Sequence, residues 1–167
     1  MMGYKRANNR SDIFQTPDTA LNPILQFIPK EYRIWEPASA NGNLVKFFSG
    51  NGYNIVGTDI NTGTDFFTNE VEFDCIITNP PYSIKDEWIE RCYSFNKPFM
   101  LLLPITALEG IKRQKQYKEH GLELILFNRR INYETPSGQG SGAYFSSAWF
   151  TYGFNLPQQL NFIEIKK

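Results

Sequence analysis

Residues that build metal sites and disulfide frameworks are scarce in this chain. Its 167 residues include 2 cysteines and 1 histidine. Cys75 and Cys92 are too few and too widely spaced for a disulfide framework or a zinc site, and no metal-ligand pattern surrounds His120. We therefore expect no metal site, and we expect two reduced thiols in the core of a cytoplasmic protein.

Long apolar runs are also missing. No stretch of the sequence approaches the roughly 20 apolar residues that cross a bilayer. Residues 1–10 are polar with scattered basic side chains, unlike the apolar core of a signal peptide. We expect a protein that is neither secreted by that route nor embedded in a membrane.

The chain has no excess charge of either sign. Its 17 Lys and Arg residues balance 17 Asp and Glu residues. Overall electrostatics therefore favours neither nucleic acid nor an anionic membrane as a partner. A prediction of nucleic-acid binding must rest on local groups of residues.

Apolar residues are plentiful and regularly distributed. With 41% hydrophobic residues, including 14 phenylalanines, the chain can bury a core as one domain. Short apolar runs alternate with helix-compatible stretches, which predicts an α/β fold with a mostly parallel sheet. Expected strands are 32–36, 54–59, 72–78, 98–104, 122–127, 143–154 and 162–165, and expected helices are 18–27, 43–49, 84–95 and 111–120. We expect segment 143–154 to be an antiparallel edge strand and residues 129–142 to form a long Gly/Ser/Pro-rich loop. Residues 1–12 are expected to form a flexible arm before a single domain over 13–167.

The tetrapeptide Asn79-Pro80-Pro81-Tyr82 directly follows the apolar run 73–78. Two consecutive prolines can continue neither a sheet ladder nor a helix, so the chain must leave the strand in a stiff, extended turn. Such a turn holds an amide and an aromatic ring at fixed positions. Because amide and backbone oxygens accept N–H bonds while a ring stacks on a flat face, the motif indicates a grip for a planar, nitrogen-bearing group.

Small residues follow Glu36 at the end of the first predicted strand, where open α/β sheets bind ligands. The segment 36–42 has one glycine instead of a G-x-G-x-x-G pattern, which favours an adenosine ligand less anionic than a dinucleotide. Asp59 ends the next predicted strand, where an acidic side chain commonly accepts hydrogen bonds from ribose hydroxyls. Both segments also have purely structural interpretations, as a tight loop and as a turn-capping aspartate.

Taken in chain order, five motifs make this sequence resemble the S-adenosylmethionine-dependent adenine-N6 DNA methyltransferases. They are Gln15-Thr16-Pro17, Glu36-Pro37-Ala38-Ser39-Ala40-Asn41-Gly42, Asp59, Asp65-Phe66 and Asn79-Pro80-Pro81-Tyr82, within residues 13–105. The tetrapeptide is a specific signal, whereas the other motifs convince through their order. The resemblance implies a three-layer, Rossmann-like methyltransferase fold with a mostly parallel seven-stranded sheet and an antiparallel edge strand. It also implies a catalytic domain without a separate target-recognition domain.

The resemblance further implies that S-adenosylmethionine is the cofactor and assigns residues to it. The pocket around its methionine end would be closed by Gln15, Thr16 and Pro17, and the loop under the methionine would contribute Glu36, Pro37, Ala38 and Gly42. The ribose would be bound by Asp59, which Ile60 follows, and the adenine would be recognised by Asp65 and Phe66. Asn79 would contact both the cofactor and the substrate.

The resemblance assigns catalysis to Asn79, Pro80 and Tyr82. The Asn79 side-chain oxygen and the Pro80 carbonyl would each accept one N–H of the target amine. Pro81, Tyr82 and Phe145 would contact a base rotated out of its helix. Phosphate contacts would come from Arg129 and Arg130 or from the basic stretch 112–118. The basic stretch can equally be interpreted as the solvent-exposed face of a helix.

The tetrapeptide identifies the reacting nitrogen better than the molecule that carries it. Similar tetrapeptides occur in methyltransferases of RNA and of protein glutamine. We favour DNA over RNA as the nucleic-acid partner. The chain has no room for the target-recognition region of sequence-specific relatives, so a specificity partner or a homo-oligomer would have to supply recognition. RNA, protein glutamine and a non-catalytic role as a partner subunit remain alternatives.

Overall fold

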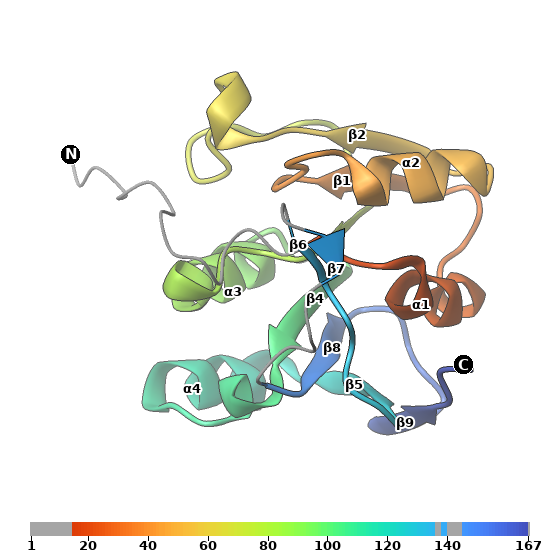
Figure 1. Cartoon of the computed structure of the whole chain (residues 1–167). Helices are drawn as coiled ribbons and strands as arrows, with labels where there is room; N and C mark the ends of the chain where they lie inside the picture. The colour runs from red at the N-terminus through yellow and green to blue at the C-terminus, as the bar shows by residue number, and fades with distance from the viewer. Residues whose placement is uncertain (1–14, 136–137, 140–144, 167) are drawn as a thin grey trace.

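The computed structural model describes residues 15–135, 138–139 and 145–166. The predicted arm over residues 1–12 lies outside them. A seven-stranded sheet with the order β2-β1-β3-β4-β8-β5-β9 forms the centre of the molecule (Figure 1). Its strands are β1 (Arg33–Glu36), β2 (Asn54–Gly57), β3 (Cys75–Thr78), β4 (Phe99–Pro104), β5 (Glu123–Phe127), β8 (Ser147–Tyr152) and β9 (Leu160–Ile163). The fold is thus the predicted α/β class with a mostly parallel sheet.

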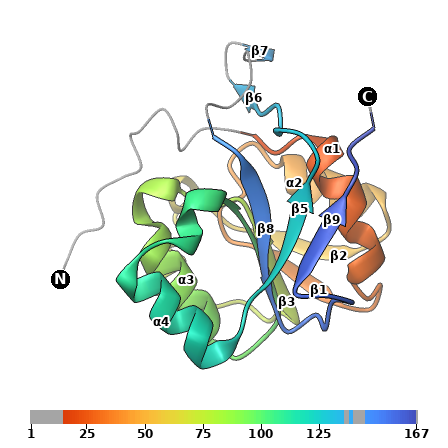
Figure 2. The ribbon, with the colours of Figure 1, turned by 90° about the horizontal axis from the view of Figure 1, so that it is seen from below.

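Helices cover both faces of the sheet and complete three layers. One face carries α1 (Asp18–Leu21), the 3-10 helix η2 (Asn22–Phe27) and α2 (Asn43–Gly50). The other face carries α3 (Lys85–Ser94) and α4 (Ile111–His120), on the opposite side of the sheet in Figures 1 and 2. Residues 18–27 are helical as predicted, but their second half is a 3-10 helix. Pro23 lacks the N–H that an α-helix would use there.

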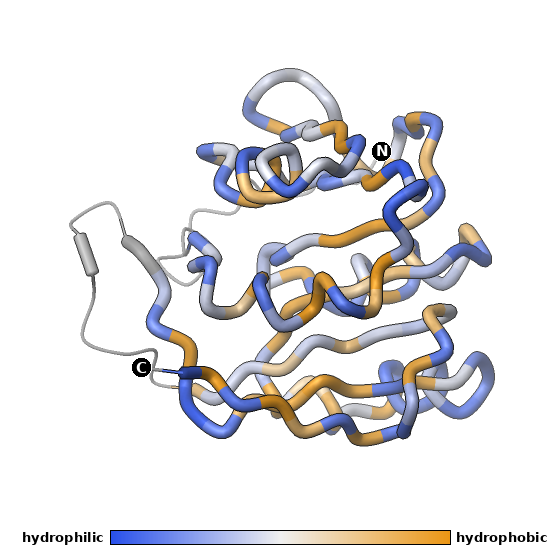
Figure 3. The backbone as a smooth tube through the Cα atoms, turned by 90° about the vertical axis from the view of Figure 1, so that its right-hand side faces the viewer, coloured by the Kyte–Doolittle hydropathy of each residue, from blue (hydrophilic) through white to orange (hydrophobic). Residues whose placement is uncertain are grey.

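The core follows the alternation of side chains along the strands. In β4, Met100 and Leu102 join the cluster beneath α1 and α2, whereas Phe99, Leu101 and Leu103 join the cluster beneath α3 and α4. A strand buried on both faces requires such a continuous apolar run. Figure 3 shows hydrophobic stretches of the backbone trace running through the middle of the fold.

The antiparallel strand β8 does not lie at the edge of the sheet, so that part of the prediction is wrong. It runs antiparallel to β4 on one side and to β5 on the other, and Trp149 pairs with both Leu102 and Ile125. Its residues are buried on both faces, as expected of an interior strand. The edges are β2 and β9 instead, where Val56 and Phe162 are exposed.

The predicted loop over residues 129–142 contains two short strands. β6 (Glu134–Thr135) and β7 (Gly138–Gln139) pair antiparallel, apart from the main sheet. Two-residue strands are too short to give an alternating apolar pattern, so the sequence did not reveal them.

Parallel pairing brings several loops to one edge of the sheet. β1, β2, β3 and β4 form one parallel series, and β5 has the same direction because both β4 and β5 run antiparallel to β8. The segments that follow these strands therefore lie at the same end of the sheet as the start of β8. Within the described residues, no helix is long and apolar enough to span a membrane, and no group of three or more His, Cys, Asp or Glu side chains could hold a metal ion.

Candidate active site

Glu36, the last residue of β1, connects two of the predicted motifs. Its side chain is buried, and Oε1 accepts hydrogen bonds from the Ala38 N–H at 2.9 Å and from the Thr78 hydroxyl. Thr78 ends β3 and directly precedes Asn79. Burial raises the pKa of Glu36 to about 8, against the bonds from Thr78 and Ala38, which lower it, and with a small increase from the charge of Asp59. The first turn and the proline tetrapeptide therefore meet at one carboxyl group.

Asp59 holds the loop after β1 in shape. One carboxylate oxygen accepts a hydrogen bond from the Ala40 N–H at 2.9 Å, and the other accepts one from the Asn61 N–H at 2.8 Å. Ala40 has φ +44° and Gly42 has φ +83°, both left-handed conformations that cost a non-glycine residue energy. The turn-capping interpretation of Asp59 is thus confirmed. Because a carboxylate has about four acceptor positions, it can also bind a ribose, which stays a prediction.

Asp65 and Phe66 differ in what they can offer a ligand. Asp65 Oδ1 accepts from the Phe67 N–H at 2.9 Å, and Oδ2 accepts no hydrogen bond from the part of the chain that the structure describes. The Phe66 ring is 3% exposed and stacks on Trp88 at 4.1 Å between ring centroids. The ring is committed to the core, so an adenine stacked on its face is incompatible with this arrangement.

The segment before α1 contributes a buried hydroxyl. Thr16 is 2% exposed, and its Oγ1 has no hydrogen-bond partner among the described residues. Such an atom costs about 1–3 kcal/mol unless something binds it. Trp149 anchors the following helix by donating to the Ala20 carbonyl at 3.0 Å. Gln15 and Pro17 are half-buried on either side of Thr16.

The turn after β3 has the predicted extended form. Pro81 has φ −60° and ψ 122° and leads into the 3-10 helix η4 (Tyr82–Ile84). Asn79 Oδ1 is shielded from solvent, and Pro80 is buried. The extended turn that the two prolines predict is therefore present, with the Asn79 amide and the Tyr82 ring at its two ends.

Tyr82 lies in an aromatic cluster with two residues from the late part of the chain. Its ring meets the ring of Phe145 edge to face at 5.5 Å between centroids, so two residues that were predicted to contact the substrate lie side by side. Tyr133 lies 6.1 Å from Phe145, and its hydroxyl is 3.2 Å from that of Tyr82. Because a ring face needs about 3.5 Å to each neighbour, a base between Tyr82 and Phe145 would require about 7 Å. A sandwiched base would have to displace Phe145.

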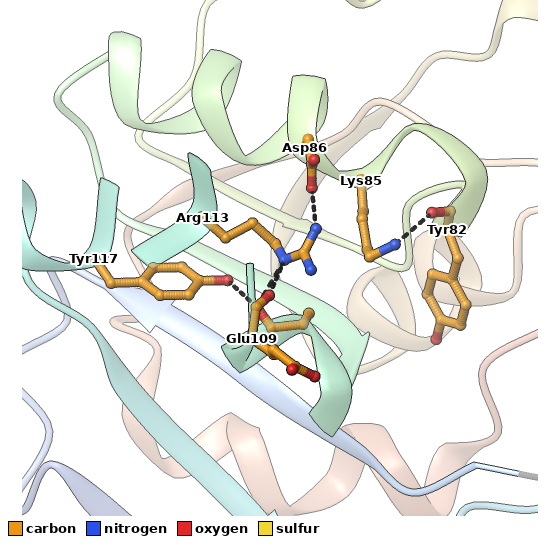
Figure 4. Close-up of polar contacts among 7 residues, drawn as sticks. Tyr82, Lys85, Asp86, Glu109, Arg113 and Tyr117 are labelled. Carbon is orange, nitrogen blue, oxygen red and sulfur yellow. Dashed lines mark hydrogen bonds and ion pairs between the residues drawn. The ribbon is translucent and has the colours of Figure 1, made fainter. Parts of the chain in front are cut away.

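The basic stretch 112–118 is partly structural. Arg113 donates to Asp86 at 2.5 Å and to the carbonyls of Glu109 and Ala107 at 2.7 and 3.0 Å, which joins α4 to α3 and to the turn after β4 (Figure 4). Lys85, beside this group in Figure 4, donates to the Tyr82 carbonyl at 3.4 Å. Lys112, Lys115 and Lys118 are exposed.

The remaining predicted site residues lie in the segments that follow β1, β2 and β5. Arg129 and Arg130 are exposed in the segment after β5, which ends at Phe127. Pro37 is buried, Ala38 and Gly42 are half-buried, and Ile60 is exposed at the start of the 3-10 helix η3 (Ile60–Thr62).

Three residues of the site escaped the sequence analysis: Thr78, Tyr133 and Ser147. Thr78 carried a usable signal, since it is a polar residue at the end of a buried run and next to the tetrapeptide. Tyr133 and Ser147 carried none, because their proximity to Tyr82 depends on how β8 enters the sheet.

No known protein family and no curated protein matches the sequence. The fold is similar to that of solved methyltransferase structures. A type I restriction-modification methyltransferase subunit from Streptococcus thermophilus matches with TM-score 0.56 and 14% identity over 95% of this chain and 48% of that chain. A protein from Pyrococcus horikoshii, provisionally described as an RNA methyltransferase, matches with TM-score 0.58 and 12% identity over 90% of each chain. A Listeria monocytogenes protein, provisionally described as a class I S-adenosylmethionine-dependent methyltransferase, matches with TM-score 0.53 and 13% identity over 99% of this chain and 68% of that chain.

These likenesses confirm the predicted Rossmann-like methyltransferase fold. The chain spans about half the length of the Streptococcus subunit, at 48% of it.

Proposed function

We propose that this protein is an S-adenosylmethionine-dependent methyltransferase that acts on the N6 amine of adenine in DNA. The observation that carries the proposal is the hydrogen bond from Thr78 to Glu36. It joins the residue before the Asn79-Pro80-Pro81-Tyr82 turn to the loop that is expected to lie under the cofactor. In this arrangement the group that grips the substrate and the group that holds the methyl donor are adjacent.

The residues present fit the proposed cofactor. Thr16 offers a buried hydroxyl that no described residue uses, and Asp65 offers a carboxylate oxygen that accepts no bond within the described chain. Asp59 keeps acceptor positions for a ribose. Gln15, Pro17, Glu36, Pro37, Ala38, Gly42, Ile60 and the backbone of Phe66 would complete the binding site. S-adenosylmethionine supplies a methyl group that its positively charged sulfur makes electrophilic.

The chain's own task in the reaction is to orient a poor nucleophile. The lone pair of an exocyclic adenine amine is delocalised into the ring. Asn79 and the Pro80 carbonyl each accept one N–H, which draws the nitrogen toward a tetrahedral arrangement with its lone pair out of the base plane. After the methyl group has been transferred, the positively charged nitrogen releases one of its two protons to solvent water. Pro81 and the ring of Tyr82 hold the base.

DNA is the favoured carrier of that adenine. Arg129 and Arg130 are exposed at the edge of the sheet that carries the tetrapeptide, where cations can contact phosphates. Phe145 adds a ring beside Tyr82. The similar Streptococcus thermophilus protein is described as a subunit of a restriction-modification system, which supports a partner, or a second copy of this chain, as the source of target specificity.

RNA is a second candidate substrate, favoured by one observation. The fold is similar over 90% of each chain to that of the Pyrococcus horikoshii protein, which is provisionally described as an RNA methyltransferase.

Incubation with methyl-labelled S-adenosylmethionine tests the proposal. Separate pools of duplex DNA, single-stranded DNA, RNA and cell protein would be offered. Label in a DNA pool is the expected result. Label in RNA would establish the second candidate. Label in protein would point to a protein substrate, and amino-acid analysis would show whether glutamine carries the methyl group. No label in any pool would contradict the enzymatic function.

A further inference from the structure

We propose that Tyr133 and Ser147 are positioning residues that hold Tyr82 in place through a chain of three hydroxyl groups. This inference rests on the proposed function, because Tyr82 matters to it as the residue that contacts the target base. Neither Tyr133 nor Ser147 belongs to a motif of the sequence. They reach Tyr82 only through the fold.

The geometry shows which hydroxyl is the donor in each hydrogen bond of this series. Tyr133 donates its hydroxyl proton to Ser147 Oγ at 2.6 Å. A hydroxyl has one proton to donate, so Tyr82 must be the donor in its 3.2 Å contact with Tyr133. The bonds therefore run from Tyr82 to Tyr133 to Ser147. Burial raises the pKa of Tyr133, which keeps that hydroxyl protonated and able to donate.

The far end of this series of hydrogen bonds, Ser147, lies in the central sheet. Ser147 is the first residue of β8 and pairs with Pro104 at the end of β4, in the interior of the sheet. Tyr82, Tyr133 and Ser147 are 8%, 3% and 5% exposed, so water does not compete effectively for their hydroxyls. The network thus connects the proposed substrate grip to a strand that pairs with β4 and β5 inside the central sheet.

This anchoring explains how one tyrosine can be held while its neighbour moves. Phe145 contacts the Tyr82 ring but has no hydroxyl with which to join the network, and it is half-buried. When a base enters, Phe145 is the ring that shifts, and Tyr82 stays in place. Accurate placement of the base then depends on Tyr133, although Tyr133 itself need not touch the substrate.

A double-mutant cycle tests the proposal. Tyr82→Phe and Tyr133→Phe each remove one hydroxyl and keep the ring. Each variant should lower kcat for methyl transfer about 5–10-fold, with the cofactor dissociation constant unchanged. The double variant should be no worse than either single variant, because both substitutions break the same bond. Ser147→Ala should have a similar effect.

Tyr53→Phe is the matched control. Tyr53 is equally buried at 6%, and its hydroxyl donates to the Ile28 carbonyl at 2.8 Å, before the start of β2. This variant should lose thermal stability and keep its kcat. A merely structural role for Tyr133 would make Tyr133→Phe behave like Tyr53→Phe.

The outcomes separate this inference from the proposed function. If the wild-type protein is active and the losses of kcat in Tyr82→Phe and Tyr133→Phe multiply in the double variant, the inference alone is overturned. The same holds if Tyr133→Phe loses no kcat. A wild-type protein that transfers no methyl group overturns the proposed function and this inference with it.

Discussion

Glu36 is a carboxyl group that the fold has removed from water. It is 1% exposed, and its pKa is raised to about 8, mainly by burial. A group whose pKa is higher in the folded state stabilises the fold below its unfolded pKa and loses that contribution as pH rises toward the folded pKa. The fold should therefore lose stability between about pH 4.5 and pH 8 on account of Glu36.

Glu36→Gln tests this directly. Glutamine keeps an oxygen that can accept from Ala38 and Thr78 but does not ionise. We expect the variant to gain stability relative to the wild-type protein as pH rises from 5 to 9, by a few kcal/mol on the order of the raised pKa. Chemical denaturation at several pH values measures the difference. Parallel stability curves would show that Glu36 ionises as easily in the folded protein as in the unfolded chain.

Thr16 allows a test in which stability and ligand binding change in opposite directions. Its buried hydroxyl has no partner among the described residues. Thr16→Val should raise the free energy of unfolding by about 1 kcal/mol or more, since a methyl group of the same shape needs no hydrogen bond. The same variant should bind S-adenosylmethionine more weakly by calorimetry.

Thr151→Val is the control for Thr16→Val. Thr151 is also fully buried, but its hydroxyl donates to the Glu123 carbonyl at 3.1 Å. This substitution should destabilise the protein by about 1 kcal/mol. A loss of stability in both variants would mean that Thr16 has a partner in the folded protein.

Individual residues were predictable from sequence where a motif fixed the local backbone. Asn79, Pro80 and Pro81 define their turn whatever surrounds it. The contact of Phe66 with Trp88 could not be predicted from the sequence, because it joins two distant segments and leaves no local pattern. Tyr133 was missed for the same reason.

The elements around the first loop are packed so closely that one of them requires glycine. A Cβ atom at Gly57, the last residue of β2, would lie 2.6 Å from Val45 of α2 and 3.0 Å from Ser39 of the loop. Both distances are too short for van der Waals contact, so α2 or the loop would have to move. The loop that we propose to lie beside the cofactor would then change shape.

Gly57→Ala should therefore weaken S-adenosylmethionine binding and destabilise the protein by about 1–3 kcal/mol. Gly50→Ala, at the end of α2, is the matched control because a Cβ there meets no atom within 4 Å. It should leave binding unchanged and stabilise α2 slightly, by about 0.5–1 kcal/mol. Equal behaviour of the two variants in thermal denaturation would contradict the close packing.

At the scale of elements, sequence periodicity located the strands and helices but not all of their neighbours. The apolar runs of β3 and β4 identified buried strands. The segment of β8 was also predicted as a strand, yet its place between β4 and β5 depends on the order in which distant strands pair, which a local pattern does not encode. The strand was consequently assigned to an edge.

For the whole molecule, cofactor binding should appear as a gain in stability. At a concentration about 100 times its dissociation constant, a ligand that binds only the folded state adds about 2.7 kcal/mol. For a chain of 167 residues this corresponds to a rise in Tm of about 5–10 °C. Thermal denaturation with S-adenosylmethionine measures it, and ATP is the control because the loop lacks a phosphate-binding glycine pattern. A shift with ATP alone would indicate a nucleotide site of another kind.

The fold as a whole could be predicted because its motifs and its alternation of strands and helices point to the same architecture. The substrate could not be predicted with equal sharpness. The tetrapeptide specifies a planar nitrogen with two N–H bonds, and such a nitrogen occurs in DNA, RNA and protein. Surface charge does not separate them either, since the chain is balanced overall.

The central claim is that the turn at Asn79 directs methyl transfer to adenine N6. Its most direct test is mass spectrometry of nucleosides from duplex DNA that has been incubated with S-adenosylmethionine and either the wild-type protein or Asn79→Ala. We predict N6-methyladenine with the wild-type protein and a loss of at least about 100-fold with the variant, at nearly unchanged cofactor affinity. Methylation of any other atom, or full activity of Asn79→Ala, would contradict the account.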